Sequence, residues 1–297
     1  MTTSVLKGKR LSSLAIVLVS ISLILSIASL GSACSPSATT ELPSHAVIVY
    51  GDSRSGHSIH KAIVQAIIKT KPSAVFHTGD LVNDGSSSSD WATFNSITSE
   101  LVESAPFYPA LGNHDLPRNR DLPPQLFLDN FDLPNNERWY SVELDGLHFI
   151  VLDSNADLIA GSEQYEWLEN ELQQVADEFA AVVFHHPVLA TGPHGDELDL
   201  SPILVPLFEE YDVELVLNGH HHNYERFFKD GLYYLVIGGG GAPLYRQEES
   251  SPYSQVFKSA YHFCALTVSD DEVTIQAFDL DLNLIDQFSI EYTVEEA

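Results

Sequence analysis

The chain has 297 residues, enough for one substantial hydrophobic core. Its 44% hydrophobic content, with 15 Phe and 12 Tyr, is that of a globular protein and argues against long disordered regions. The 42 acidic and 14 basic side chains give a formal net charge of -28. Such a charge repels polyanions and suits a solvated surface, so we expect neither nucleic acid nor an anionic membrane surface as a partner of the folded part.

The first segment, residues 1–33, has the pattern of an export signal. Basic residues at positions 7, 9 and 10 precede a run, 11–30, that contains no charged residue. At a rise of ~1.5 Å per residue this run is also long enough to cross a bilayer. A cleaved signal and an uncleaved N-terminal anchor are therefore both open.

A cysteine, Cys34, follows a Gly-Ser-Ala tripeptide and begins a polar tether, residues 34–44. This arrangement resembles a bacterial lipoprotein processing site, where the thiol is acylated and becomes the new N-terminus, although Gly31 stands where that pattern usually has Leu. Lipidation, anchoring and secretion after ordinary cleavage all place the remaining domain, residues 45–297, outside the cytoplasm. The other cysteine, Cys264, is predicted to be a buried, inert thiol.

From residue 45 onward, short runs rich in Val, Ile and Phe alternate with segments of helical periodicity. The expected strands are 46–50, 74–78, 107–111, 140–152, 180–184, 214–217 and 232–237. The expected helices are 57–71, 90–104, 162–176, 201–211 and a short one at 124–130. This order predicts an α/β fold with covered sheets, in which ligands collect at the carboxyl ends of strands.

Three further segments have distinct patterns. Residues 266–292 are predicted to form antiparallel strands that complete the second sheet. Residues 116–138, rich in Pro, Asn and Arg, follow a polar strand end and are expected to form a rim or lid. The glycine run 238–241 lacks the Lys-Ser/Thr of a phosphate-binding loop, so it predicts close backbone packing instead.

Metal-binding side chains follow five of the expected strands. The motifs are Gly51-Asp52, Gly79-Asp80, Gly112-Asn113-His114-Asp115, His185-His186-Pro187 and Gly219-His220-His221-His222. Carboxylate oxygens and imidazole nitrogens together suit zinc, iron and manganese. A lone Gly-Asp is common in turns and a lone buried histidine is usually a core residue. Five such motifs at successive strand ends predict a metal centre.

These residues, in this order, resemble the calcineurin-like metallophosphoesterases, and the stretch Gly-His-His-His-Asn-Tyr-Glu-Arg at 219–226 is similar to the purple acid phosphatase branch. The resemblance covers about residues 47–245. It implies a four-layer α/β/β/α sandwich of two mixed β-sheets with a dimetal centre at the strand ends. It also implies two metal ions, Fe, Zn or Mn, that activate water for attack as a hydroxide on a phosphate ester.

The resemblance also implies a role for each motif residue. The implied ligands are Asp52, Asp80 and His222 for the first metal, and Asp80, Asn113, His185 and His220 for the second. Asp80 would bridge the two metals, and His114 would protonate the leaving group. His194 matches a position that contacts the substrate phosphate, with a solvent-exposed loop histidine as the alternative. His186 and His221 are expected to pack around the ligands.

Two positions near the first metal depart from the pattern. Arg54 stands where many family members have His, and Asn83 stands where the purple branch has Tyr. Without a tyrosinate, the charge-transfer colour and a firmly held ferric ion should be absent. Asn83 is then an additional oxygen ligand, or the first metal is more hydrated. Arg54 is predicted to clamp phosphate oxygens, and a salt bridge to a nearby acidic group is the alternative.

The sequence therefore predicts an exported two-metal hydrolase that acts on a small phosphorylated substrate, most simply a phosphomonoesterase. A cyclic-nucleotide or other phosphodiesterase is the alternative enzyme, and the rim 116–138 is expected to decide between them. The alternative outside enzymology is a surface metal-binding module that has lost turnover. Contact with a membrane is expected only through the N-terminal segment or a lipid on Cys34.

Overall fold

The computed structural model describes residues 42–176, 178–195, 199–269 and 272–291. The predictions of an export signal, a lipidated Cys34 and an N-terminal anchor fall on residues 1–41 and lie outside the described residues. Within the described part, no helix is long and apolar enough to cross a membrane.

One sheet has the strand order β13-β12-β11-β1-β2-β3. Its strands are β1 (Val47–Tyr50), β2 (Ala74–His77), β3 (Phe107–Pro109), β11 (His262–Val268), β12 (Glu272–Asp279) and β13 (Leu284–Glu291). The first three are parallel to one another, and β11 pairs antiparallel with β1. The antiparallel strands predicted near the C-terminus are thus confirmed, but the prediction that they complete the second sheet was wrong, because β11 pairs with β1 of the first sheet.

The other sheet has the order β10-β8-β9-β7-β6-β5-β4. Its strands are β4 (Tyr140–Leu144), β5 (Leu147–Val151), β6 (Phe179–Phe184), β7 (Leu215–Asn218), β8 (Tyr224–Lys229), β9 (Leu232–Ile237) and β10 (Ser254–Lys258). The prediction of a single strand over 140–152 was wrong. Asp145 and Gly146 adopt positive φ angles of 54° and 78°, which turn the chain into the β4–β5 hairpin.

The sequence reasoning missed β8 and β10. Charged residues interrupt the apolar pattern of β8, and β10 is a short strand at the sheet edge with no fully buried side chain. Both strands therefore lack the alternation of apolar and polar residues by which a strand is recognised.

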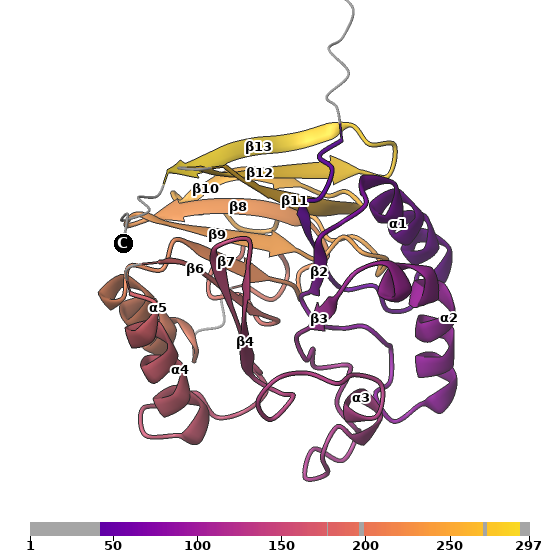
Figure 1. Cartoon of the computed structure of the whole chain (residues 1–297), viewed down its shortest axis with the longest axis horizontal. Helices are drawn as coiled ribbons and strands as arrows, with labels where there is room; N and C mark the ends of the chain where they lie inside the picture. Colours follow the sequence, from indigo (N-terminus) through magenta and orange to yellow (C-terminus); the bar gives the residue numbers. More distant parts are fainter. Residues whose placement is uncertain (1–41, 177, 196–198, 270–271, 292–297) are drawn as a thin grey trace, which may run out of the picture. The chain divides into compact units, whose positions relative to one another are not determined.

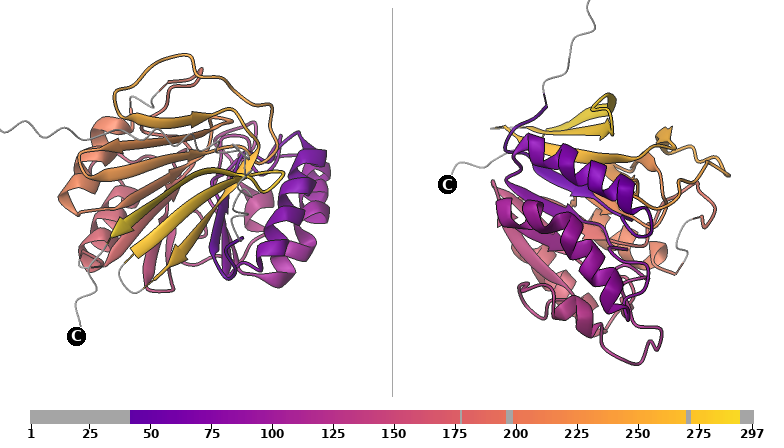
Figure 2. Two further views of the ribbon diagram at one scale, coloured as in Figure 1. Left: turned by 90° about the horizontal axis from the view of Figure 1, so that it is seen from above. Right: turned by 90° about the vertical axis from the view of Figure 1, so that its right-hand side faces the viewer.

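Helices cover the outer face of each sheet. α1 (His57–Thr70) and α2 (Ser88–Ser104) lie beside β1–β3, whereas α4 (Glu163–Gln174) and α5 (Ser201–Glu210) lie beside the other sheet (Figures 1 and 2). Ser87 caps α2, because its hydroxyl oxygen accepts a hydrogen bond from the Asp90 amide. The short α3 (Gln125–Leu128) belongs to the predicted rim segment.

Side chains of β6 show how the four layers pack. Val182 and Phe184 belong to a core cluster with residues of α4 and α5, whereas Ala181 and Val183 join the cluster that includes the first sheet. Successive strand residues point to opposite faces, so β6 is buried on both sides. Between the sheets, the rings of Phe76 in β2 and Phe149 in β5 stack with centroids 4.4 Å apart. The predicted α/β/β/α sandwich of two mixed sheets is confirmed.

Candidate metal centre

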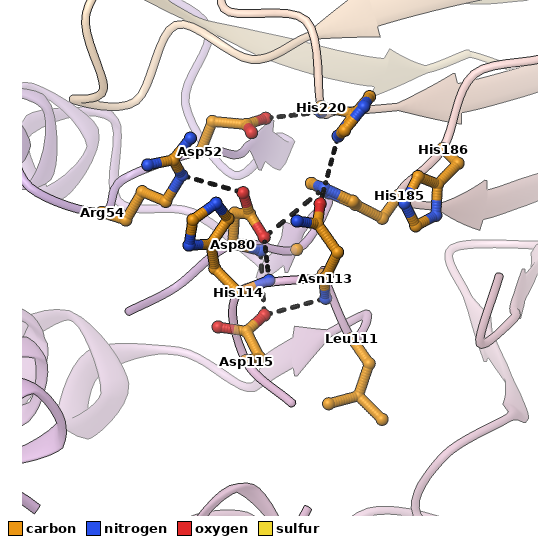
Figure 3. A network of polar contacts seen from close by, with 12 residues as sticks. Asp52, Arg54, Asp80, Leu111, Asn113, His114, Asp115, His185, His186 and His220 are labelled. Atoms are coloured by element: carbon orange, nitrogen blue, oxygen red, sulfur yellow. Dashed lines mark hydrogen bonds and ion pairs between the residues drawn. The ribbon is translucent and has the colours of Figure 1, made fainter. Parts of the chain in front are cut away.

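The predicted ligands other than Asn83 gather where parallel strands of both sheets end, and Figure 3 labels all of these except His222. Those in the first sheet are Asp52 after β1, Asp80 after β2 and Asn113 after β3, and those in the second are His185 after β6 and His220 and His222 after β7. Five strand ends that are far apart in the sequence therefore meet at one place, as their motifs predict.

Three of these residues have backbone conformations that residues other than glycine rarely adopt. Asp52, Asp80 and His220 have φ angles of 56°, 59° and 68°, in the left-handed region. This conformation costs about 1–2 kcal/mol for a residue with a Cβ, and the surrounding structure must supply that energy.

A first group of donor atoms comes from Asp52, Asp80 and His222, which are all buried and offer one ligand atom each within 4.8 Å of the others. His222 Nδ1 lies 2.8 Å from the carbonyl oxygen of Pro243 and must donate to it. The other nitrogen, Nε2, then carries a lone pair and lies 3.5 Å from Asp52 Oδ1. Among the described residues that buried oxygen has no hydrogen-bond partner, as expected for an atom that faces a cation.

A second group is centred on His185. Its Nδ1 lies 2.9 Å from the Thr78 carbonyl oxygen, which can only accept, so Nε2 carries a lone pair. That lone pair faces Asn113 Oδ1 at 3.0 Å and His220 Nδ1 at 3.2 Å. His185 Nε2 and Asn113 Oδ1 both present lone pairs at this distance, an arrangement that a positive charge between them would stabilise. The residues present therefore fit a metal ion.

His186 was expected to pack around the ligands, but it lies close enough to be a ligand of the second group itself. It offers a ligand nitrogen within 4.8 Å of those of His185 and His220. Its Nδ1 is 2.8 Å from the hydroxyl of Ser154, and burial, followed by the charge of His185, lowers its pKa to about 3. His186 is therefore a neutral imidazole at the edge of the second group.

Asp80 connects the two groups. It belongs to the first, and its Oδ1 lies 3.5 Å from His185 Nε2 in the second. Burial raises the pKa of Asp80, but His185, His114 and Arg54 outweigh it and hold that pKa below its usual range. Burial and the charge of Asp80 raise the pKa of Asp52 well above its usual range. The position of Asp80 is that of a bridging ligand.

Arg54 occupies the side of the first group. Its Nε lies 2.9 Å from Asp80 Oδ2, and its Nη2 lies 3.4 Å from His222 Nε2. The structure thus shows the salt-bridge alternative, and Arg54 as a phosphate clamp stays a prediction. The guanidinium partly offsets the negative charge of this group.

His114 lies beside Asp80, where the resemblance implies a proton donor. Its backbone amide donates to Asp80 Oδ1 at 2.8 Å, and its Nδ1 lies 2.9 Å from the backbone carbonyl oxygen of Asn83. Nδ1 therefore donates to that oxygen and leaves Nε2 as the nitrogen for proton transfer. The Asn83 side chain is exposed and forms no hydrogen bond with the ligand set in the described residues. Its role as a ligand stays a prediction.

His194 is exposed, as its alternative predicts, but it also lies against the centre. Its ring centroid is 4.9 Å from that of His220 and 5.6 Å from that of Tyr245. Tyr245 in turn stacks on His222, with centroids 4.1 Å apart and planes at 23°. Sequence reasoning gave Tyr245 no role, because no local pattern shows that it returns to cover a ligand.

Asp115 is part of the motif after β3, but no local pattern predicts a role for it. Its Oδ2 accepts hydrogen bonds from the amides of Asp80 and Gly112, and its Oδ1 accepts one from Val82. One buried carboxylate thereby fastens the loop after β2 to the loop after β3. Asp115 is a positioning residue for two ligand loops.

Two glycines leave space for the ligands. A Cβ atom on Gly112 would lie 2.1 Å from the Asp80 amide nitrogen, and one on Gly238 would lie 2.8 Å from Asp52 Oδ2. Both distances are too short for any side chain. Gly238 begins the glycine run 238–241, so the close backbone packing predicted for this run is confirmed.

The imidazoles of His185, His220 and His222 are neutral. Burial is the main cause in each case, and it lowers the pKa of His222 to about 4 and those of His185 and His220 below their usual range. Neutral imidazole is the form that binds a metal. Neighbouring groups of carboxylate and imidazole donors, joined by a shared aspartate at the end of an α/β/β/α sandwich, define a dinuclear metal centre.

Comparison with known proteins identifies the family. The model of the calcineurin-like phosphoesterases matches residues 45–224, which contain every predicted site residue. The chain belongs to the calcineurin-like phosphoesterase family.

Among curated proteins, a probable purple acid phosphatase 20 of Arabidopsis thaliana is 29% identical over an alignment of 199 residues, which covers 57% of this chain and 46% of that protein. A phosphoenolpyruvate phosphatase of Allium cepa is 26% identical over an alignment of 210 residues, which covers 62% of this chain and 42% of that protein. A probable inactive purple acid phosphatase 27 of Arabidopsis thaliana is 28% identical over an alignment of 245 residues, which covers 66% of this chain and 39% of that protein. The chain spans about half the length of the curated relatives it matches.

Two solved structures share the fold. The purple acid phosphatase PPD1 of yellow lupin, Lupinus luteus, matches with a TM-score of 0.75 at 22% identity, over 84% of this chain and 54% of that one. GAP50, described as the anchor in the inner membrane complex of Plasmodium, matches with a TM-score of 0.70 at 18% identity, over 84% and 89% of the two chains.

Proposed function

We propose that this protein is an exported two-metal hydrolase of phosphate esters that acts mainly on phosphomonoesters. The observation that carries this proposal is the position of Asp80, which reaches both groups of donor atoms and holds the backbone of His114 beside them. A bridged pair of metal sites with an adjacent imidazole is the arrangement that phosphoryl transfer to water requires.

Each of the two groups of donor atoms would bind one metal ion. Asp52, Asp80 and His222 would hold one metal, while Asp80, Asn113, His185 and His220 would hold the other. When bound, the two metals supply Lewis-acid polarisation of the phosphoryl group and activation of water.

The remaining steps belong to side chains. His114 gives the proton on Nε2 to the departing alkoxide, while its Nδ1 stays bonded to the Asn83 carbonyl and keeps the ring oriented. Arg54 turns part of its fork from Asp80 towards the phosphate oxygens, and His194 approaches them from the opposite loop.

Three considerations favour monoesters over diesters. The Tyr-Glu-Arg sequence, residues 224–226, is that of the purple branch, and the named relatives are phosphatases. An exported phosphatase can release phosphate from external nucleotides or sugar phosphates. A cyclic-nucleotide or other phosphodiesterase is the second candidate, because a two-metal centre can catalyse the hydrolysis of both monoesters and diesters.

A metal-binding module without turnover is the alternative outside enzymology. One relative is named as probably inactive, and GAP50 is described as an anchor. Against this alternative, the ring of His114 is held in place by its own hydrogen bond to Asn83. A binding module has no use for an oriented proton donor.

The test uses the full-length chain in detergent, stripped of metal and reloaded with Zn, Mn, Fe or Co. Hydrolysis of p-nitrophenyl phosphate and of bis(p-nitrophenyl) phosphate is then measured side by side. We expect metal-dependent turnover, faster on the monoester. Faster turnover of the bis-ester would establish a phosphodiesterase, and bound metal without any turnover would establish the binding module.

For the location, we propose a protein held outside the cytoplasm by a lipid on Cys34 or by an uncleaved segment 11–30. Cell fractionation of the wild type and of Cys34→Ser separates these two. Loss of the variant from the membrane fraction supports lipidation, and retention supports the anchor. A wild type found in the medium indicates secretion, and one found in the cytoplasm refutes export.

A further inference from the structure

A pocket of about 540 Å³ lies directly beside the metal centre and is formed mostly by the rim segment 116–138. Its wall includes Asn113, a predicted metal ligand, together with Arg120, Arg138 and Asn155. This volume lies within the range of small-molecule sites. Asn113 therefore belongs both to the predicted ligand set and to the wall of this pocket.

Arg120 is the unusual residue of this pocket. Its Nη1 donates to the backbone carbonyl of Asn113 at 2.8 Å, which fixes the guanidinium beside the centre. Among the described residues it forms no ion pair, although the chain has 42 acidic and only 14 basic side chains. Arg118 and Arg138, its neighbours in the rim, pair with Asp84 and Asp153.

Arg138 forms a fixed part of the wall. Its Nε lies 2.9 Å from Oδ2 of the fully buried Asp153. Asp153 Oδ1 also accepts from the Asn155 side chain at 3.0 Å, and Asn155 donates to the Leu111 carbonyl at 3.1 Å. The wall is therefore preorganised, and Arg120 is the guanidinium whose charge is left for a ligand.

The position of His114 shows which part of a substrate reaches this wall. A second, smaller pocket of about 150 Å³ is lined by His114 and shares Asn113, Leu116 and Arg120 with the first. The residue that protonates the leaving alcohol must lie on the leaving-group side. The alcohol part of the ester therefore lies against His114 and points towards Arg120.

We infer that this pocket is a leaving-group subsite in which Arg120 binds a second anionic group, a carboxylate or another phosphate, carried by the alcohol part of the ester. The inference rests on the proposed function for its orientation of the ester, and it makes anionic alcohols the preferred substrate class. A planar guanidinium binds both groups through paired hydrogen bonds.

The test compares esters that differ in one charge. The substrates are 3- and 4-carboxyphenyl phosphate and the corresponding carbamoylphenyl phosphates, in which an uncharged amide of the same shape replaces the carboxylate. For the metal-loaded full-length protein we expect kcat/KM about tenfold higher for the better carboxylate than for its amide, the effect of one charge-assisted hydrogen bond. In Arg120→Gln the ratio should fall to about one.

The ratio separates direct binding from an indirect effect through Asn113, because damage to the metal site lowers both rates together. Asp121→Asn is the matched control, since Asp121 lines the same pocket with the opposite charge. It should keep or increase the preference. A ratio that is equal in the wild type and in Arg120→Gln overturns the inference.

Calorimetry separates this inference from the proposed function. Carboxybenzylphosphonates and carbamoylbenzylphosphonates keep the same charges but contain no ester bond to cleave. If no ester is hydrolysed while the carboxylates bind about tenfold tighter in an Arg120-dependent way, the proposed function fails and the subsite stands. If esters are hydrolysed without any such preference in rate or binding, the subsite fails and the proposed function stands.

Discussion

The two halves of the metal centre are built from the same kinds of residue but differ in charge. The half formed by Asp52 and His222 contains a buried carboxylate with a raised pKa and is occupied at one side by Arg54. The half formed by His185, Asn113 and His220 is uncharged. The Thr78 carbonyl fixes the tautomer of His185. The second half is therefore preorganised for a metal, whereas in the first a metal must compete with a guanidinium.

This difference predicts unequal metal affinities, with the His185 half filled first. It also agrees with the two departures from the family pattern, Arg54 and Asn83, which both lie near the first half. Where the family pattern places a histidine and the purple branch a tyrosine, this chain has a cation and an exposed amide. The first half has lost potential ligands, and the second has kept its full set.

The largest effect should come from Asp80→Asn, which alters both halves at once. We expect turnover to fall by about 10³-fold or more, because the bridging charge is lost, and the metal content to fall below one ion per chain. Metal analysis after dialysis and initial rates on p-nitrophenyl phosphate measure the two effects. As a control, His222→Ala should lose the first metal only. Full retention of both metals in Asp80→Asn would contradict a bridging role.

Loss of the proton donor His114 should lower turnover without changing metal binding in either half. His114→Gln removes the donor while its backbone amide to Asp80 remains, so we expect turnover to fall by about 10²- to 10⁴-fold with unchanged metal content. Substrates with a better leaving group, which need no proton, should lose less. Equal losses for all leaving groups would exclude His114 as the general acid.

Arg54→Met tests the competition in the first half directly. Removal of the guanidinium 2.9 Å from Asp80 should tighten binding of the more weakly held metal by about tenfold, since a charge-assisted hydrogen bond contributes about 1.5–3 kcal/mol before solvent screening. If Arg54 also clamps phosphate, KM should rise at the same time. Competition with a fluorescent chelator measures the affinity. Weaker metal binding would show that Arg54 supports the site.

The smallest expected effect is a pH dependence of folding stability that comes from Glu214, which lies just before β7. It must be known before the pH dependence of either half of the centre is interpreted. Burial raises the pKa of Glu214 to about 7 from an ordinary value near 4.5, although its carboxylate accepts a hydrogen bond from the Ala180 amide at 2.8 Å. The folded state therefore holds this proton to higher pH than the unfolded state. Its stabilising contribution is complete below pH ~4.5 and is lost as the pH rises towards 7.

Glu214→Gln should flatten this pH dependence, because the amide does not titrate. Chemical unfolding of the metal-free variant and the wild type at pH 5, 6 and 7 measures the free energy of unfolding. Glu143→Gln, which changes an exposed carboxylate of β4 in the same sheet, is the control. An identical slope in the wild type and Glu214→Gln would show that Glu214 is already solvated.

Local sequence determined a large part of this protein. Buried strands such as β6 and β9 are continuous apolar runs, and the helices have apolar periodicity with serine caps at Ser87 and Ser162, so both types follow from short-range pattern. The meeting of the predicted metal ligands at one place was predictable for the same reason. Each follows a recognisable strand, and the resemblance to a known family added the pairing of ligands into two sites.

Tertiary structure decided what depends on residues that are distant in the chain. No local pattern shows that Tyr245 stacks on His222, that Asp115 fastens two ligand loops, or that His186 joins the second group. The ion pair of Arg54 with Asp80, and the lack of one at Arg120 within the described part of the chain, are likewise results of packing. Sequence fixes which side chains are available, but their partners depend on how the two sheets meet, and that is set by long-range burial.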